Sequence, residues 1–345
     1  MTQPIAGPRP HLRTLLSALI GGVLRGPCGG AAERALVRLG HRFPRRLPAR
    51  GVIAEQLMRR HAGADLVATL FNGARVSVPS TREGFHMYFT GRSFAEDEGL
   101  TRLLPRLLRE GDVFFDVGAN LGFYTLPAAR ACGPSGRVHA FEAQAALAGR
   151  LRKSVALNGY ESRIVVRHAA VSDRHGGETV LYLAEDKDTL LGVPSLLRHE
   201  WLAQGSREIV PAVSIDGYVQ EHRISRVNVA KFDIEGAEVM ALRGMRLTLE
   251  RAAPEALIVE VLPDALTFNS IGAGASLRPA PGAGKRAELL DLLRGYGYEP
   301  RPITEDGRLG PRYTPEQWNS ISHTVNVAFI LPGLKQSRVD AFARG

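Results

Sequence analysis

Gly111-Asp-Val-Phe-Phe-Asp-Val-Gly-Ala-Asn-Leu-Gly-Phe-Tyr-Thr125 is the stretch of the chain that decides the fold. Its apolar run 113–117 is typical of a short buried strand, and Gly118 and Gly122 mark a glycine-rich turn before a helix. From here to residue 331, short apolar runs alternate with helical patterns of roughly 10–15 residues. This alternation predicts an α/β fold with a mainly parallel, doubly wound sheet.

The hydrophobic periodicity also gives the bounds of the expected elements. A hairpin is expected at Gly176-Gly177, and the Gly/Ala/Pro-rich segment 272–284 predicts a mobile loop. The expected strands are 113–117, 137–142, 164–171, 179–183, 227–234, 256–262 and 323–331. The expected helices are 94–110, 121–131, 145–158, a short one near 216–222, 237–251 and 286–295.

Composition divides the 345 residues into three parts. Residues 1–60 predict a basic helical N-terminal extension interrupted by prolines. Residues 61–110 hold two alternating runs around Asn72-Gly73, a strong hairpin signal, and then the leucine-rich helix. Residues 111–335 form the expected α/β domain.

The net charge of +9 lies entirely in residues 1–60, which contain 11 Arg and two Glu. The remainder of the chain is therefore neutral. A folded nucleic-acid binder more often carries its basic patch on the domain face itself, so we expect no nucleic-acid partner. Two cysteines give neither a disulfide framework nor a four-ligand zinc site, which favours a reducing, cytoplasmic compartment.

The apolar run Leu15–Leu24 has basic flanks but is shorter than the roughly 20 residues that a membrane span needs. It predicts an amphipathic helix that packs on the protein or lies on a membrane surface, and secretion is the last choice. Peripheral membrane association of residues 1–60 therefore stays open. The sequence leaves the oligomeric state undetermined.

The glycine-rich turn does not fit a dinucleotide cofactor. A dinucleotide fingerprint needs glycine at positions 118, 120 and 123, and the chain has Gly118, Asn120 and Phe123. Asp116, at the end of the strand, can accept hydrogen bonds from a cationic amino-acid group. Glu142 ends the second strand, 20 residues after Gly122, where an acid binds the two hydroxyls of a ribose. A nucleoside joined to an amino acid, without phosphate, indicates S-adenosylmethionine.

Four motifs together make the sequence resemble the FkbM-type methyltransferases. They are the stretch 111–125, Phe141-Glu142, Ala170-Val-Ser-Asp173 and Lys231-Phe-Asp-Ile-Glu-Gly-Ala-Glu238. The resemblance runs from about Leu66 to Leu331 and leaves residues 1–60 outside. It implies a Rossmann-like class I fold with a seven-stranded, mostly parallel sheet and helices on both faces. It also implies S-adenosylmethionine-dependent O-methylation of hydroxyls on sugars or polyketides.

The resemblance also implies roles for residues in this sequence. It assigns Asp116, Gly118, Asn120 and Gly122 to the methionine side of the cofactor, Glu142 to the ribose, and Ala170 and Val171 to the neighbourhood of the adenine. Asp173 could reach the adenine amino group or could cap a turn.

Candidates for the reacting end come from the fourth strand. Lys231, Asp233 and Glu235 alternate with apolar residues, so a strand continuing that far would place them on one side. We expect Asp233 near the methyl group or the cofactor amine, and Glu235 as a base or as a residue that orients the substrate. The alternative is structural, with a Lys231–Asp233 ion pair and with Glu235 and Glu238 capping the next helix.

Weaker substrate candidates are Ser195 and His199, in a segment between strands, and Glu260, at the end of the fifth strand. His168 is expected to be a packing residue, and no metal is required. The predicted function is methylation of a hydroxyl on a sugar-containing or polyketide-type small molecule or glycan. Two alternatives stay open: a non-catalytic scaffold with this fold, and a nicotinamide-dependent oxidoreductase.

Overall fold

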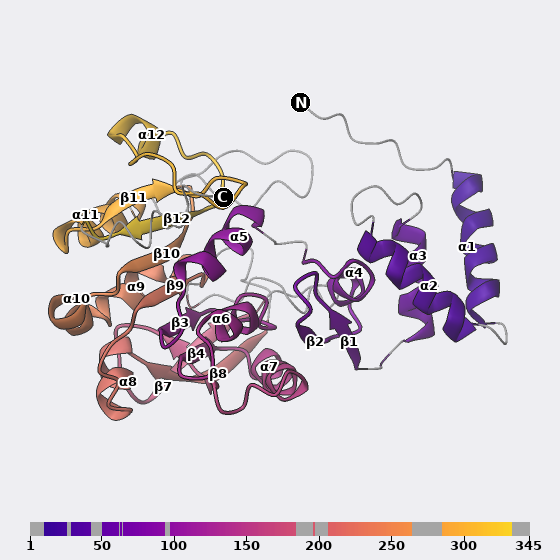
Figure 1. Ribbon diagram of the computed structural model, residues 1–345, viewed down its shortest axis with the longest axis horizontal. Helices are drawn as coiled ribbons and strands as arrows, with labels where there is room; N and C mark the ends of the chain where they lie inside the picture. The colour runs from indigo at the N-terminus through magenta and orange to yellow at the C-terminus, as the bar shows by residue number, and fades with distance from the viewer. Residues whose placement is uncertain are drawn as a thin grey trace. The chain divides into compact units, whose positions relative to one another are not determined.

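The computed structural model describes residues 10–25, 29–42, 50–61, 63, 65–93, 97–183, 196, 206–263 and 285–332. The chain divides into two compact units, which are described separately here. The first consists mainly of Met1–Glu96, and the second of Asp97–Glu185 and Gly192–Gly345. Figure 1 labels most elements of both. The predicted loop 272–284 lies outside the described residues.

The first unit combines helices with a small hairpin, as the sequence predicts. Its turn contains Gly73 at a φ of 85°, and Ala74 N–H donates to the Asn72 side chain over 3.0 Å. The two strands pair antiparallel from Leu66↔Val78 to Thr69↔Arg75. The elements are α1 (Pro10–Arg25), α2 (Gly29–Arg42), α3 (Arg50–Arg60), β1 (Leu66–Thr69), β2 (Arg75–Val78) and α4 (Arg82–Thr90).

A buried carboxylate holds the helices of this unit together. Glu33, on α2, accepts hydrogen bonds from the Tyr88 hydroxyl of α4 over 2.6 Å and from Arg60 Nε of α3 over 2.9 Å. His61 Nε2 lies 2.7 Å from the same carboxylate. Burial opposes the charge, but these partners outweigh it and lower the pKa of Glu33. The ionised form is therefore the one that the fold stabilises.

A seven-stranded sheet forms the centre of the second unit, and this confirms the predicted fold class. Its order is β11-β12-β10-β9-β3-β4-β5, and only β12 pairs antiparallel, with both of its neighbours. Its strands are β3 (Val113–Val117), β4 (Arg137–Glu142), β5 (Ile164–His168), β9 (Val229–Phe232), β10 (Ala256–Val261), β11 (Glu299–Pro302) and β12 (Val325–Ile330).

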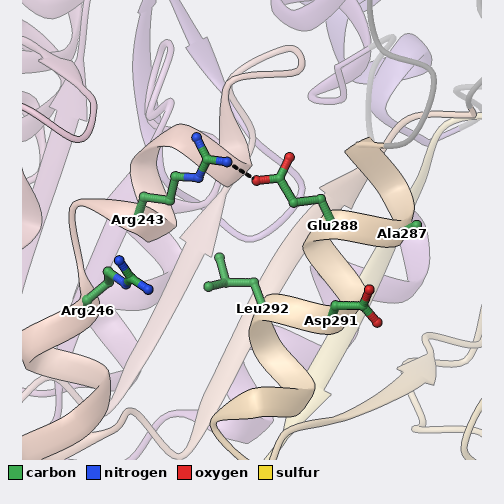
Figure 2. Close-up of a pocket in the computed structure, with 6 residues that line it drawn as sticks. All are labelled: Arg243, Arg246, Ala287, Glu288, Asp291 and Leu292. Atoms are coloured by element: carbon green, nitrogen blue, oxygen red, sulfur yellow. Dashed lines mark hydrogen bonds and ion pairs between the residues drawn. The ribbon is translucent and has the colours of Figure 1, made fainter.

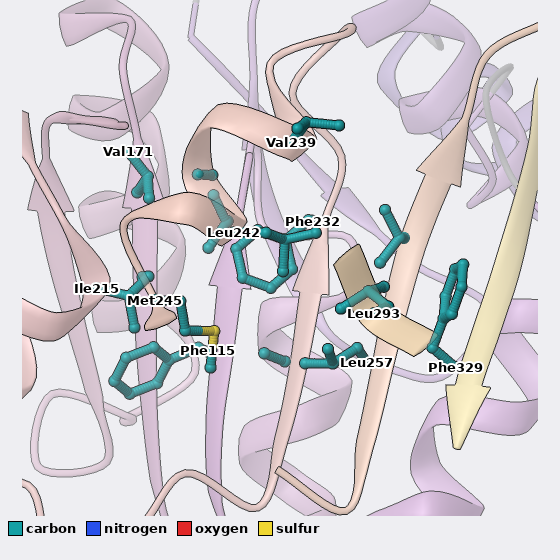
Figure 3. Packing of buried hydrophobic residues seen from close by; sticks show 14 of the residues in the cluster. Phe115, Val171, Ile215, Phe232, Val239, Leu242, Met245, Leu257, Leu293 and Phe329 are labelled. Atoms are coloured by element: carbon teal, nitrogen blue, oxygen red, sulfur yellow. The ribbon is translucent and has the colours of Figure 1, made fainter. Parts of the chain in front are cut away.

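Helices cover both faces of this sheet. Helices α6 and α7 pack on β4, and α7 also on β5, on one face. The other face carries an extended apolar cluster, in which Phe115, Phe232 and Leu257 from neighbouring strands pack against residues of α8–α11 (Figure 3). The helices are α5 (Glu98–Leu107), α6 (Thr125–Ala131), α7 (Ala145–Leu157), α8 (Ile215–Glu221), α9 (Glu238–Arg243), α10 (Arg246–Ala252), α11 (Lys285–Gly295) and α12 (Pro315–Asn319). None of the helices in the described ranges is long and apolar enough to cross a membrane.

The expected third strand is divided, and the hairpin predicted at Gly176-Gly177 is wrong. After β5 the chain forms β6 (Ala170–Val171), which belongs to a separate sheet with the order β6-β8-β7. Strand β7 (Glu178–Tyr182) pairs antiparallel with β8 (Arg207–Val213), a strand that the sequence analysis missed. The apolar alternation of β7 was visible, but its distant partner was not.

Other boundaries differ for local reasons. The expected helix 237–251 breaks at Gly244, where any Cβ would lie 2.1 Å from the carbonyl oxygen of Ser172. The edge strand β11 was missed because Pro300 and Pro302 argue against a strand in the sequence. An edge strand tolerates them because one side of its backbone needs no ladder bonds.

Candidate cofactor and acceptor site

The loop after β3 has a backbone that turns through three left-handed residues. The φ values are 83° at Gly118, 51° at Asn120 and 92° at Gly122. A Cβ on Gly118 would lie 1.9 Å from the carbonyl oxygen of Asp233, so the loop packs directly against the end of β9. The motif glycine is therefore required by a close backbone approach as well as by its conformation.

Glu142 links the end of β4 to this loop. One carboxylate oxygen accepts the backbone N–H of Asn120 over 2.8 Å, and the other accepts that of Gln144 over 2.8 Å. Burial raises the pKa of Glu142 to about 7, partly offset by these two hydrogen bonds. A carboxylate has about four lone-pair directions, so each oxygen keeps capacity for one more donor. The two ribose hydroxyls of an adenosine would fit this capacity.

Asp116 lies at the end of β3 and is only 1% exposed. Its Oδ2 accepts a hydrogen bond from the Thr125 hydroxyl over 2.6 Å, and its Oδ1 lies 3.8 Å from Lys231 Nζ without a hydrogen-bond partner. Burial raises the pKa of Asp116, against the opposing effects of Lys231 and Thr125. This buried, unsatisfied oxygen is consistent with a cationic group of a cofactor, although Lys231 already supplies one positive charge.

Lys231 is buried on β9 between two acids. Its Nζ lies 2.9 Å from Asp233 Oδ2 and 5.1 Å from the centre of the Tyr124 ring. Burial disfavours the ammonium group, but Asp233 and Asp116 outweigh this effect and raise the pKa of Lys231. The ion pair with Asp233 is the structural interpretation that the sequence left open for this lysine.

Three predicted acids converge at the ends of β9 and β10. Carboxylate oxygens of Asp233, Glu235 and Glu260 lie within 4.8 Å of one another. A continuing strand is not the reason, because β9 ends at Phe232 and Glu235 has a φ of 56°. The turn at Glu235 brings its carboxylate to Glu260, which the parallel pairing of β9 and β10 places alongside. We call Asp233, Glu235 and Glu260 the carboxylate cluster.

Burial, and then repulsion from neighbouring carboxylates, favours the protonated forms of Glu235 and Glu260. These effects raise the pKa of Glu235 to about 8 and that of Glu260 well above its ordinary value. Glu238 lies next to the cluster and accepts the backbone N–H groups of Ile234 and Gly236 over 3.0 and 3.1 Å. It therefore holds the turn that precedes α9, whereas the structural alternative had it capping the helix itself, and α9 has no side-chain cap.

Three carboxylates at this spacing could also bind a divalent cation, because Mg²⁺ and Ca²⁺ prefer oxygen ligands. The sequence analysis assigned no metal, and that assignment stays a prediction. The cluster has chemistry of its own, because a carboxylate with a pKa near the working pH is suited to accept a proton from a hydroxyl.

The remaining predicted residues lie at different places. Ala170 and Val171 are buried in β6, and the N–H of Ala169 donates to the carbonyl oxygen of Glu142 over 3.1 Å, so this strand begins beside the ribose candidate. Asp173 is exposed in the bend after β6. His168 Nε2 lies 2.9 Å from the carbonyl oxygen of Ala143, which fits a packing role. Ser195 and His199 lie outside the described residues.

The sequence analysis missed several side chains that support the site. Thr125 and Tyr124 contact Asp116 and Lys231, and both lie in the motif stretch itself. Asn326 is the register partner of Glu260 on β12, and its Nδ2 donates to Asp97 over 3.1 Å. No sequence signal joins two residues that are 229 positions apart.

A surface groove elsewhere in the second unit is formed by α9, α10 and α11 (Figure 2). An ion pair joins Arg243 and Glu288 across it. None of the predicted site residues lines this groove. Its lining residues are Arg243, Arg246, Ala287, Glu288, Asp291 and Leu292.

The strand order, together with an acid at the end of β3 and of β4, defines a methyltransferase of the seven-stranded, S-adenosylmethionine-dependent class. The family model of the methyltransferase FkbM domain matches residues 116–300, more than half of the chain. The protein belongs to the FkbM methyltransferase family. This confirms the resemblance that the four motifs indicated.

Similar proteins include a hexuronic acid methyltransferase, AglP, of Haloferax volcanii, which is 27% identical over 184 residues. That match covers 51% of this chain and 66% of the relative, slightly less than two thirds of its length. Among solved structures, an O-methyltransferase from Bacillus cereus in complex with SAH is 12% identical, with a TM-score of 0.38 over 69% of this chain and 82% of that one. A SAM-dependent methyltransferase from Aquifex aeolicus is 12% identical, with a TM-score of 0.33 over 69% and 94%.

Replacing Gly118 with alanine should displace the loop after β3, because the new Cβ would lie 1.9 Å from a backbone oxygen. We expect Gly118→Ala to lower the free energy of unfolding by about 3 kcal/mol or more and to weaken S-adenosylmethionine binding. Gly159→Ala is the matched control, since Gly159 has a φ of 65° but no atom within 4 Å of its Cβ position. It should cost only about 1 kcal/mol in urea unfolding. Equal losses in the two variants would contradict the close approach.

Replacing Lys231 with methionine should leave Asp116 buried without its cation. We expect Lys231→Met to cost about 3–5 kcal/mol in urea unfolding. The pKa of Asp116 is already raised by burial, and losing Lys231 raises it further. The native state then binds more protons than the unfolded state, so the loss should grow as the pH rises above about 4, the ordinary pKa of an aspartate. Adding Asp116→Asn should recover stability and flatten this pH dependence. A loss that does not change with pH would argue against the charge pairing.

Proposed function

We propose that this chain catalyses the S-adenosylmethionine-dependent methylation of a hydroxyl group on a sugar-containing acceptor. The observation that carries the proposal is the contact between two predicted sites. Gly118 of the cofactor loop packs against the backbone of Asp233, whose carboxylate belongs to the carboxylate cluster. A cofactor held by this loop would therefore present its reactive end close to acids that can act on an acceptor.

The residues present fit the cofactor. Glu142 offers free acceptor capacity for two ribose hydroxyls, and Asp116 has a buried oxygen without a hydrogen-bond partner. S-adenosylmethionine, when bound, supplies a methyl group on a positively charged sulfur. We assign Asp116, Gly118, Asn120 and Gly122 to its methionine side, Glu142 to its ribose, and Ala170, Val171 and Asp173 to the adenine end.

The carboxylate cluster favours a hydroxyl as the acceptor. A hydroxyl donates a hydrogen bond to a carboxylate, whereas an acidic acceptor group would be repelled by Glu235 in the ionised form that acts as a base. Aligning the acceptor oxygen with the methyl group can lower the barrier by roughly 7–11 kcal/mol, and removing the proton adds to this. We assign Asp233 to positioning, through its ion pair with Lys231. Glu235 is our candidate for the base, and Glu260 contacts the acceptor.

A sugar-containing acceptor is supported by the similarity to a hexuronic acid methyltransferase. Sugars present several hydroxyls in a fixed geometry, which suits a cluster of hydrogen-bond acceptors. A polyketide-type hydroxyl is the second choice. A nicotinamide cofactor is disfavoured because Asn120 and Phe123 stand where its fingerprint needs glycine.

Calorimetric titration with S-adenosylmethionine tests the cofactor assignment. We expect Glu142→Gln to bind it about 10–100-fold more weakly, because the variant loses charged acceptors for the ribose hydroxyls. Glu161→Gln changes an exposed glutamate in the same way and should bind like the parent chain. NADH is titrated in parallel. Unchanged binding in Glu142→Gln would contradict the ribose role, and NADH binding would favour an oxidoreductase.

The pH dependence of methyl transfer tests the base. A carboxyl base works in its ionised form, so kcat should rise with pH up to about 8, where Glu235 loses its proton, and then level off. Glu235→Gln should lower kcat about 100-fold or more and abolish this rise, while leaving cofactor binding intact. A parent profile that is flat between about pH 6 and 9 would contradict the assignment.

Product analysis separates the proposed acceptor from others. Neutral methyl glycosides, methyl glucuronide and simple polyketide-type alcohols serve as acceptors, with Glu161→Gln again as the control. The proposal expects one added methyl group on a glycoside, stable to mild alkali as an ether is. An alkali-labile product would be a methyl ester and would contradict hydroxyl methylation. Transfer to the alcohols alone would contradict a sugar acceptor.

A further inference from the structure

Helix α1 of the first unit has two unlike faces. One face packs on α3, where Gln56 Nε2 donates to the Ser17 hydroxyl over 2.7 Å and Leu24 is only 2% exposed. The opposite face presents Leu15, Leu19 and Val23 at 68%, 65% and 50% exposure. Residues spaced four apart lie on the same side of a helix, so these side chains form a continuous row. We call this row the apolar stripe.

The stripe differs from scattered surface leucines. The exposed positions between its members, Ala18 and Gly22, are small, so no polar side chain at these positions interrupts it. Large apolar side chains that stand alone on a surface are common, but an aligned row marks a contact surface. The proposed methyl transfer makes no use of α1, so the stripe calls for a separate explanation.

The charge of the surrounding helices indicates the partner. Arg25, Arg34 and Arg38 are exposed on α1 and α2. The two acids of α1–α3 do not balance them, because Glu33 is buried among its partners and Glu55 pairs with Arg59 over 2.8 Å. An apolar row on a basic helical unit matches the two features of an anionic lipid surface, an acyl layer below negatively charged phosphates.

We propose that α1 binds the surface of an anionic bilayer, with the apolar stripe inserted among the acyl chains and exposed arginines of α1 and α2 contacting the lipid phosphates. A second copy of the chain is a poorer match. It would place its own basic helices against the basic helices of the first copy, and like charges across an interface oppose association. This inference goes beyond the proposed reaction and does not depend on it.

Vesicle flotation of the full chain tests the proposal. The probes are phosphatidylcholine vesicles with and without phosphatidylglycerol. Binding should require the anionic lipid, and Leu15→Gln/Leu19→Gln/Val23→Gln should lower the partition coefficient about tenfold or more. Ile209→Gln/Leu247→Gln removes exposed apolar side chains elsewhere and should bind like the parent chain. Arg34→Gln/Arg38→Gln should weaken binding to the anionic vesicles, whereas Arg174→Gln/Arg251→Gln should have a smaller effect.

Two further measurements keep the proposal open to refutation. The stripe variant should keep the parent Tm, since its side chains are exposed, and a Tm lower by several degrees would show that the rest of the chain covers the stripe. Sedimentation velocity of parent and variant follows self-association. A dimer that the stripe variant alone disrupts, with vesicle binding unchanged, would make the stripe a contact between copies and overturn the proposal. Equal binding of parent and stripe variant to anionic vesicles would also overturn it.

Discussion

The arrangement of the central strand ends in the second unit depends on one buried positive charge. Lys231 lies in the central strand β9, and its ammonium group is placed between Asp116 of β3 and Asp233 just beyond β9. Burying a lysine or an aspartate alone costs several kcal/mol, so Lys231 and Asp116 are each tolerated only because charged partners are present. The charges thereby fix the ends of the two central strands relative to each other. Both the cofactor loop and the carboxylate cluster begin at these ends.

Backbone contacts also connect the cofactor loop to the neighbouring strands. Gly118 leaves space for the carbonyl oxygen of Asp233, and Glu142 holds the N–H of Asn120 in the same loop. The loop is therefore tied to β9 by contact and to β4 by a hydrogen bond. A displacement of the Asp233 backbone would therefore shift the cofactor loop as well.

Much of the site could be predicted because it lies next to strand ends that the apolar pattern marks. Asp116 and Glu142 follow such runs directly, and parallel strands bring their carboxyl ends to one edge. The sequence analysis predicted the members of the carboxylate cluster, but not the reason why they lie together. The sequence pattern suggested a longer strand, whereas a left-handed turn at Glu235 brings the acids together. The pairing of β7 with β8 was missed because the sequence analysis did not predict strand β8.

The sequence by itself determined the fold class, the cofactor motifs, the family and the location of the positive charge. These properties follow from local spacing, since strand periodicity, glycine positions and strand-end acids can be read within short windows. Only the tertiary structure decided how the charges are compensated and which surfaces stay exposed. Lys231 forms ion pairs with two acids, and Asn326 donates a hydrogen bond to Asp97. Leu15 stays exposed while Leu24 is buried. These outcomes depend on contacts between residues far apart in the chain, which packing alone selects.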